Sequence, residues 1–153
     1  SVAALDNGGF VVTWDSYYQD SSNTWGVYGK MYDAEGEAES YEFRVNTTTS
    51  SNQYQQSVTD LDGGGFVVTW YSDSHSKTFA QIFDRDGSPQ GGEFEVSQHS
   101  SSYQPEVARL DGGGFVVTWE DNTTSNDGSG GEPGCPPPLP PPPVGCWPYC
   151  WPP

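Results

Sequence analysis

The stretch LDGGGFVVTW, residues 61–70, decides the fold of this chain because it occurs three times. A first copy, LDNGGFVVTW, spans residues 5–14, and a third copy, identical to the second, spans residues 110–119. Successive copies begin 56 and 49 residues apart (5 to 61, then 61 to 110). A period of this length is typical of a repeat architecture, so the sequence predicts one structural unit used about two and a half times.

Each copy has the pattern of a β-hairpin. The Asp can cap a turn, and the glycines after it allow backbone with positive φ, which tight turns between strands require. Phe66, Val68 and Trp70 then alternate with Val67 and Thr69, so the first three share one face of a strand that can be buried.

Two further strands follow the hairpin in each of the first two copies. Alternating apolar residues and an Asp/Gly turn before the last strand mark them. The expected strands are 2–5, 10–14, 27–32 and 42–46 in the first repeat, 58–61, 66–70, 78–83 and 93–96 in the second, and 106–110 and 115–119 in the third.

We therefore expect an all-β fold with about ten strands, in two four-stranded antiparallel repeats (residues 1–56 and 57–105) and a partial third (106–119). Either a partial propeller or a two-sheet sandwich would bury the Phe/Val/Trp face. The residues expected to be mostly buried are Phe10, Trp14, Phe66, Trp70, Phe115 and Trp119. Because the third copy stops after its hairpin, Phe115, Val117 and Trp119 are expected to find their partner on a neighbouring molecule.

The composition favours a β protein and argues against several functions. Of 153 residues 14% are aromatic, and 21 acids against five bases give a formal charge of −16. Such a surface repels nucleic acid and anionic membranes, and no apolar run approaches the ~20 residues of a transmembrane helix. We expect no nucleic-acid partner, no membrane insertion and, without a recognisable catalytic constellation, no enzymatic activity. Ser1 opens directly on the first strand, which indicates a processed chain or a fragment.

The composition changes after residue 119. Residues 120–134 read as a Gly/Ser/Asn linker, and residues 135–153 are rich in Pro, Cys and Trp. The run 136–143 predicts a polyproline II rod of roughly 25 Å, at about 3.1 Å per residue. The aromatic residues between the last prolines are expected to dock on a neighbouring subunit; they are Trp147, Tyr149 and Trp151.

Together, the hairpin copies, the Phe83–Gly87 turn and the Glu93–Val96 strand resemble the tandem β-repeats of large bacterial surface and calcium-dependent exported proteins. The resemblance covers roughly residues 1–119 and carries no catalytic residue. The tail resembles the hydroxyproline-rich segments of algal walls and flagellar hairs, which implies hydroxylated and glycosylated prolines. The chain departs from the repeat family in its small number of copies and in its polyproline tail. The combination resembles subunits of extracellular glycoprotein fibrils.

Covalent glycans are expected at two sequons and in the proline run. Asn46-Thr47-Thr48 and Asn122-Thr123-Thr124 match the N-glycosylation pattern, and both fall in expected loops. The proline positions that the tail resemblance implies are Pro136, Pro137, Pro138, Pro140, Pro141, Pro142 and Pro143.

Paired acids in the two tight Gly turns are the candidate metal ligands. Their oxygens suit Ca²⁺, and the alternative is that each Asp caps its own turn. These acids are Asp33, Glu35, Asp84 and Asp86. No other cofactor is expected, and His75 and His99 are expected to be surface residues.

All three cysteines, Cys135, Cys146 and Cys150, lie in the tail. A disulfide between the first two or the last two would leave one thiol free or available for pairing between molecules. Zinc binding is the alternative, but no nearby histidine supplies a fourth ligand.

Two functions compete at this point. The first is a structural subunit of an extracellular, glycosylated filament that assembles head to tail by strand pairing between subunits and by docking of the tail. Its partners would be further copies of the chain and glycans. The second is a carbohydrate-binding or adhesion module whose loop aromatics stack on sugars. The aromatics in question are Tyr17, Tyr18, Trp25, Tyr71 and Tyr103.

Overall fold

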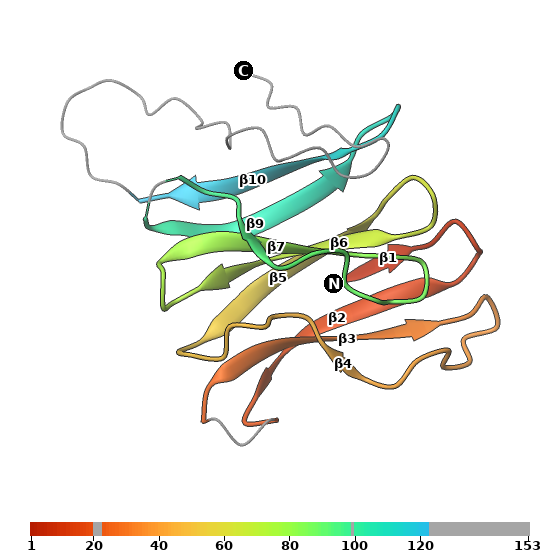
Figure 1. Cartoon of the computed structure of the whole chain (residues 1–153), viewed down its shortest axis with the longest axis horizontal. Coiled ribbons are helices and arrows are strands. Elements are labelled where there is room, and N and C mark those ends of the chain that lie inside the picture. The colour runs from red at the N-terminus through yellow and green to blue at the C-terminus, as the bar shows by residue number, and fades with distance from the viewer. Residues whose placement is uncertain (20–22, 99, 123–153) are drawn as a thin grey trace.

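The structure is a computed structural model that describes residues 1–19, 23–98 and 100–122. Within these ranges the chain contains strands and no helix, which confirms the all-β prediction. Figure 1 shows three antiparallel sheets that follow one another, with strand orders β1-β2-β3-β4, β5-β6-β7-β8 and β9-β10. The sheets of four, four and two strands correspond to the two full repeats and the partial third repeat.

The strands occupy equivalent places in each repeat. In the first sheet they are β1 (Val2–Ala4), β2 (Phe10–Tyr17), β3 (Trp25–Tyr32) and β4 (Phe43–Arg44). In the second they are β5 (Gln53–Asp60), β6 (Phe66–Ser72), β7 (Lys77–Phe83) and β8 (Phe94–Glu95), and in the third β9 (Ser102–Arg109) and β10 (Phe115–Asp121).

The Asp/Gly turns form as the sequence predicts. In the second repeat the Leu61 amide donates to the Gly65 carbonyl at 2.8 Å, and the Gly64 amide donates back to the Leu61 carbonyl at 3.2 Å. Gly63 and Gly64 have φ values of 93° and 92°, a region that residues with a side chain rarely adopt. This geometry explains why glycine occupies both positions.

The strand boundaries differ from the prediction at both ends of the repeat. β5 begins at Gln53, inside the segment expected to be a link, and a register shift between Tyr54 and Ser57 carries it past Gln55, whose φ is 58°. A bulge of this kind bends a strand without ending it.

The fourth strands, β4 and β8, are shorter than expected. Each contains two residues because a side chain takes over the next bond of the ladder. Asn46 Oδ1 accepts from the Val27 amide at 2.8 Å, and Ser97 Oγ accepts from the Thr78 amide at 3.0 Å. Sequence periodicity alone does not distinguish such a bond from a backbone bond.

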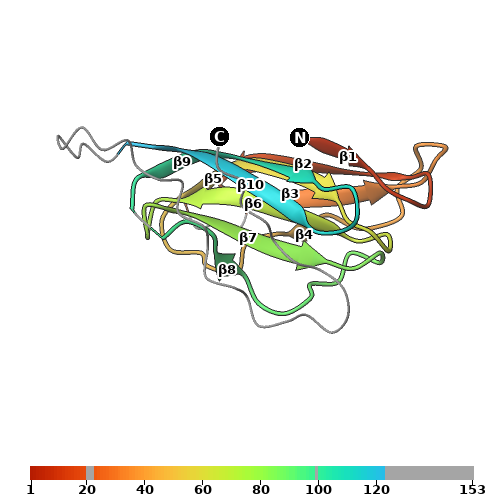
Figure 2. The same ribbon diagram turned by 90° about the horizontal axis from the view of Figure 1, so that it is seen from above.

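Two hydrophobic cores lie between successive sheets. The first combines residues of the first sheet, such as Val11 and Met31, with Phe66 and Trp70 of the second. The second core combines Val67 and Ala80 of the second sheet with Val107 and Phe115 of the third. In Figure 2 the β9–β10 hairpin lies over the second sheet, and β9 contacts β5, β6 and β7. The sheets are therefore stacked in series.

The burial of the repeated aromatics depends on their position in this stack. Phe66, Trp70 and Phe115 are buried, as predicted, whereas Phe10, Trp14 and Trp119 are only half-buried. The expectation that the third hairpin lacks a partner within the chain is wrong. Its apolar face packs on the second sheet, because sheets in this chain cover one another by their faces and do not need to extend one another at their edges.

Candidate interaction surfaces

The outer face of the first sheet repeats a surface that the other two sheets bury in the hydrophobic cores. Phe10, Val12 and Trp14 alternate along β2 on this face, and the cross-strand partners of Val12 are Val2 and Lys30. The Phe10 and Tyr32 rings stack with centroids 5.0 Å apart and planes 10° apart. We call this surface, defined by Val2, Phe10, Val12, Trp14, Lys30 and Tyr32, the open face.

The same positions in the later repeats are covered by the preceding sheet. Phe66 and Phe83 stack as Phe10 and Tyr32 do, at 4.9 Å, but Phe43 of β4 lies 5.5 Å from the Phe83 ring and closes the pair. In the third repeat, Phe94 of β8 packs in the cluster that contains Phe115. The open face therefore differs from the equivalent faces of the second and third sheets, because no sheet of the described chain packs on it.

The opposite end of the stack presents the complementary surface. Val11, Thr13, Val67 and Thr69 are the covered residues on the forward-facing sides of the first two sheets, and all four are buried. Their equivalents in β10 are Val116, which is half-buried, and Thr118, which is exposed. We call the surface formed by Val116, Thr118 and the β9 neighbour Ala108 the trailing face.

The outer edge of β10 is also available within the described residues. β2 and β6 each pair with strands on both sides, whereas β10 pairs only with β9 in the part of the chain that the structure describes. Such an edge presents backbone amides and carbonyls to which another strand can bind. The predicted assembly residues Phe115 and Val117 are not available to a neighbouring molecule, because they pack in the core against the second sheet.

The aromatic residues expected to stack on sugars divide into two groups. Tyr17, Tyr18 and Trp25 form a contiguous exposed cluster at the β2–β3 end, with ring centroids 5.9 Å (Tyr17–Tyr18) and 5.4 Å (Tyr17–Trp25) apart. Tyr71 is buried and Tyr103 lies 4.7 Å from it, so these two rings belong to an internal contact. The prediction that they are sugar-stacking loop residues is not supported by this placement.

Tyr54 completes the internal tyrosine group. Its ring lies 5.4 Å from the Tyr71 ring, and its hydroxyl donates to Asp73 Oδ1 at 2.9 Å. Burial raises the pKa of Tyr54 to about 12, and the hydrogen bond to the Asp73 carboxylate adds to the effect. The Tyr54 phenol is therefore neutral at this sheet junction.

Two carboxylates, those of Asp15 and Glu93, join the first sheet to the second, and their pKa values are shifted in opposite directions. Burial raises the pKa of Asp15, although Oδ2 accepts from the Gln55 amide at 2.9 Å. Burial also acts against ionisation of Glu93, but hydrogen bonds from the Thr48 hydroxyl and the Thr47 and Thr48 amides outweigh it and lower the pKa of that carboxyl. Both carboxylates bond mainly to backbone amides of the segments that link the two sheets, so both are assigned to the junction.

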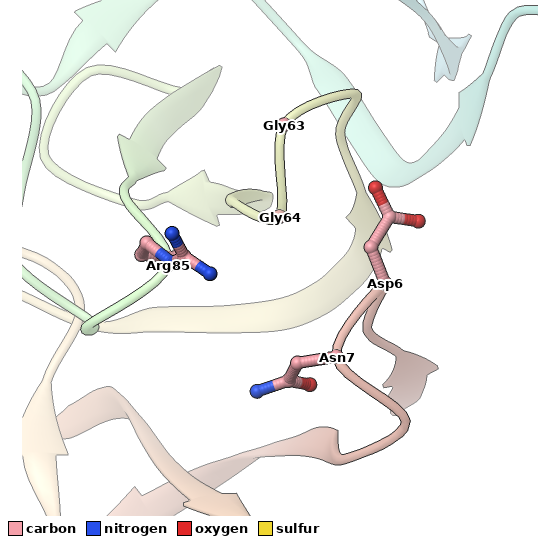
Figure 3. A pocket seen from close by; sticks show the side chains of 5 residues that line it. All are labelled: Asp6, Asn7, Gly63, Gly64 and Arg85. Carbon is pink, nitrogen blue, oxygen red and sulfur yellow. The ribbon is translucent and has the colours of Figure 1, made fainter.

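A hollow of about 120 Å³ lies between the Asp/Gly turns of the first two repeats (Figure 3). Asp6 and Asn7 line it on one side, Gly63 and Gly64 on another, and Arg85 on a third. Asn7 Oδ1 already accepts from the Gly9 amide at 2.9 Å. One carboxylate, one amide and one guanidinium around glycine backbone do not form an arrangement of nucleophile and base.

Arg109 connects the turns of all three repeats. Its guanidinium contacts the Asp60 carboxylate and lies 2.5 Å from Asp62 Oδ1 and 3.5 Å from Asp6 Oδ1. The hydrogen bond with Asp60 is the main reason why the pKa of Arg109 is raised. Sequence reasoning did not identify this network, because Asp6 and Arg109 are 103 residues apart and nothing in the repeat pattern pairs them.

The paired acids of the Gly turns are engaged by their own backbone. Asp33 Oδ1 accepts from the amides of Glu35 and Glu37 at 3.1 and 2.7 Å. Asp84 Oδ1 accepts from the amides of Asp86 and Ser88 at 3.0 and 2.9 Å. The capping alternative therefore describes both aspartates. In the portion of the chain with described coordinates, no group of three or more His, Cys, Asp or Glu side chains is placed to hold a metal ion.

The two sequon asparagines have different environments. Asn46 is only 1% exposed, and its Nδ2 donates to the Thr48 carbonyl at 2.7 Å. Asn46 lies outside the strands, as expected, but it is buried, so a glycan on Nδ2 would have to displace buried contacts. Asn122 is exposed, as expected for a modified residue.

The last predicted residues are the histidines and the residues of the tail. His75 is exposed, with Nδ1 2.8 Å from Ser74 Oγ, which fits the predicted surface position. The remaining predictions, which concern His99, the cysteines, the prolines and the tail aromatics Trp147, Tyr149 and Trp151, lie outside the described residues.

Comparison with known proteins gives no relative from which a function could be transferred. No family model matches the chain, and no curated protein or solved structure is significantly similar to it. Among the residues described, no helix is long and apolar enough to cross a membrane. The fold defines the class of the chain, an all-β repeat protein with stacked antiparallel sheets.

Proposed function

We propose that the chain is a non-catalytic structural subunit of an extracellular filament, in which copies associate head to tail. The observation that carries the proposal is the open face. Phe10, Val12 and Trp14 have the same sequence as two sets of residues that pack in the cores between sheets, yet these three belong to neither core and stay half-buried in the described part of the chain.

The occupant of the open face is the trailing face of a second copy. Within the chain, the Phe/Val/Trp faces of the second and third sheets each pack against the Val/Thr face of the sheet before them. The trailing face carries the same residue types, with Val116 in the place of Val67 and Thr118 in the place of Thr69. The trailing face of a second copy can therefore pack on the open face in the way that successive sheets pack at two places within one chain.

This contact is heterologous, because two different surfaces of the subunit meet. Heterologous contacts continue into open filaments unless the rotation between copies closes a ring. The outer edge of β10, which no strand pairs with in the described ranges, adds a second contact of the predicted kind, since it can pair with a strand from a neighbour.

The extracellular setting, the glycans and docking of the tail are parts of the proposal that rest on the sequence. The formal charge of −16 favours a soluble surface over binding to nucleic acid or anionic membranes. The exposed Asn122 supports glycosylation at one sequon, whereas burial of Asn46 speaks against the other.

Analytical ultracentrifugation of the whole chain over a concentration series tests the assembly. We expect the weight-average mass of the wild-type protein to rise with concentration, and Val12→Asp to abolish the rise. Tyr41→Asp is the control, because Tyr41 is 95% exposed and lies outside both faces. A wild-type chain that stays monomeric at millimolar concentration would contradict the proposal.

A mixing experiment tests the direction of assembly. Val12→Asp disables the open face and Thr118→Arg disables the trailing face, so neither variant should assemble alone. An equimolar mixture should assemble, because each variant keeps one intact face and the altered faces carry opposite charges. Should Thr118→Arg assemble normally alone, the trailing face is not part of the contact between copies, and the head-to-tail model is wrong.

A further inference from the structure

We infer that the exposed cluster of Tyr17, Tyr18 and Trp25 is a binding site for a neutral saccharide, separate from the surfaces proposed for assembly. The three side chains are 51%, 57% and 41% exposed. Each ring contacts the next, with centroids 5.9 and 5.4 Å apart and planes tilted by 49° and 48°. We call them the aromatic platform.

The hairpin holds the platform in place. Tyr17 and Trp25 are paired across β2 and β3, and the Tyr17 hydroxyl donates to Asn23 Oδ1 at 2.8 Å. The Tyr18 amide donates to the Thr24 carbonyl at 3.2 Å. A rigid aromatic surface loses little conformational entropy when a ligand binds.

Tyr18 adopts a backbone conformation that a bulky residue rarely occupies. Its φ is 70°, in the left-handed region that favours glycine. Such conformations persist where the surrounding structure imposes them and are concentrated at functional sites. An aromatic ring at this position therefore has a cost to folding that glycine would avoid.

The repeat itself does not require the platform. Seven residues separate β2 from β3, whereas four separate β6 from β7. The shorter turn of the second repeat places Asp73 after its strand, where the first repeat has Tyr17. Insertions in one repeat commonly form binding loops on an otherwise regular scaffold.

The chemistry of the surroundings selects the ligand class. The negative faces of the aromatic rings attract the polarised C–H groups of a sugar ring. The amide of Gln19, the residue after Tyr18, can bond to hydroxyl groups, and its Nε2 donates to Glu42 Oε2 at 2.9 Å. The formal charge of −16 disfavours an acidic polysaccharide. Because the rings contact one another, they do not form a cage around a cation.

Affinity electrophoresis of the whole chain in native gels containing a dissolved β-glucan, mannan or galactan tests the site. We expect at least one of these neutral polysaccharides to retard the protein. Trp25→Ala should weaken the retardation about tenfold, and Trp25→Phe should retain most of it because an aromatic face remains. Tyr41→Ala removes an exposed tyrosine that is not one of the three platform rings, and it should behave as wild type.

Tyr18→Gly separates binding from folding. Glycine accepts the left-handed backbone, so thermal unfolding should occur at the wild-type temperature or above it, while retardation by the neutral polysaccharide weakens. The inference is overturned by a lack of retardation in all three gels, by retardation only in an anionic polygalacturonate gel, or by equal behaviour of Trp25→Ala and Tyr41→Ala. Retardation that Tyr18→Gly leaves unchanged equally overturns the role of that ring.

Discussion

The faces formed by Phe10, Val12 and Trp14 and by Phe66, Val68 and Trp70 have the same sequence and different surroundings. The second set lies in the core between the first two sheets, with Phe66 and Val68 fully buried. The first set is half-buried and faces away from that core. Local sequence therefore specifies the strand and its two sides, and the neighbouring sheet decides what each side contributes to stability.

Alanine at the two equivalent phenylalanines gives the largest expected contrast. Phe66→Ala should cost about 3–5 kcal/mol, because it leaves a cavity between two packed sheets. Phe10→Ala should cost about 1 kcal/mol in the monomer, mainly through loss of the stack on Tyr32. Urea unfolding at micromolar concentration measures both. Equal losses would show that the open face is already covered in the isolated chain.

Alanine at the equivalent glycines Gly36 and Gly87 gives a smaller contrast. Both have positive φ, 84° and 77°, so both substitutions should cost about 1 kcal/mol through the backbone. A Cβ at Gly87 would also lie 2.8 Å from the Met31 sulfur of the first sheet, whereas a Cβ at Gly36 meets no atom within 4 Å.

We therefore expect Gly87→Ala to be the more destabilising substitution, by up to about 1 kcal/mol since the Met31 side chain can move. The difference between their midpoints in urea unfolding measures the contact between repeats. If Gly36→Ala is the more harmful substitution, the turn of the first repeat has a cover that the described chain does not reveal.

The hairpins, the strand order within each sheet and the glycine turns were predictable because they depend on local pattern. LDGGGFVVTW specifies a turn and an alternating strand wherever it occurs, and all three copies form that hairpin. The length of β4 was not predictable, because Asn46 replaces a backbone bond with its side chain. Burial of Asn46 follows from the same bond.

The order of the sheets in space decides which apolar faces are buried and which aromatic residues come together. This order has no signature in the sequence. The hairpin of Phe115 was predicted to need a second molecule because the count of strands ended there. It packs by its face on the second sheet, and the repeated Phe/Val/Trp face that lies outside both cores is at the other end of the stack. Of the sugar candidates, Tyr17, Tyr18 and Trp25 come together at one hairpin end.

Glutamine at Glu93 and at Glu42 tests the junction between repeats with a matched pair. Both glutamates precede a phenylalanine of a short fourth strand. Glu93 reaches the amides of Thr47 and Thr48, while Glu42 is exposed. Glu93→Gln should cost about 1 kcal/mol at pH 7, since the partly exposed carboxylate is screened by solvent, and Glu42→Gln should cost a few tenths.

The pH dependence provides an independent measurement for Glu93. Its pKa in the folded chain is lowered, so the stability it contributes is complete above the unfolded value of about 4.3 and is lost as the pH falls through the folded pKa. Thermal unfolding between pH 7 and pH 3 should therefore show a weaker acid destabilisation in Glu93→Gln than in wild type. A difference that stays constant over this range would assign the effect of the substitution to packing alone.

Asparagine at Asp15 should produce the smallest change, with the opposite sign. Asp15 lies at the same junction, but burial raises its pKa in the folded chain, so its ionised form opposes folding. That cost appears as the pH rises from the unfolded value of about 3.9 through the folded pKa, and it is fully present above the folded pKa.

Asparagine keeps an oxygen for the Gln55 amide without the buried charge. At pH 7 we expect Asp15→Asn to be more stable than wild type by a few tenths of a kcal/mol, and the gain should vanish below pH 4. A loss of stability at pH 7 would show that the charged carboxylate is needed to hold β5 against β2, and that both carboxylates at this junction act with the same sign.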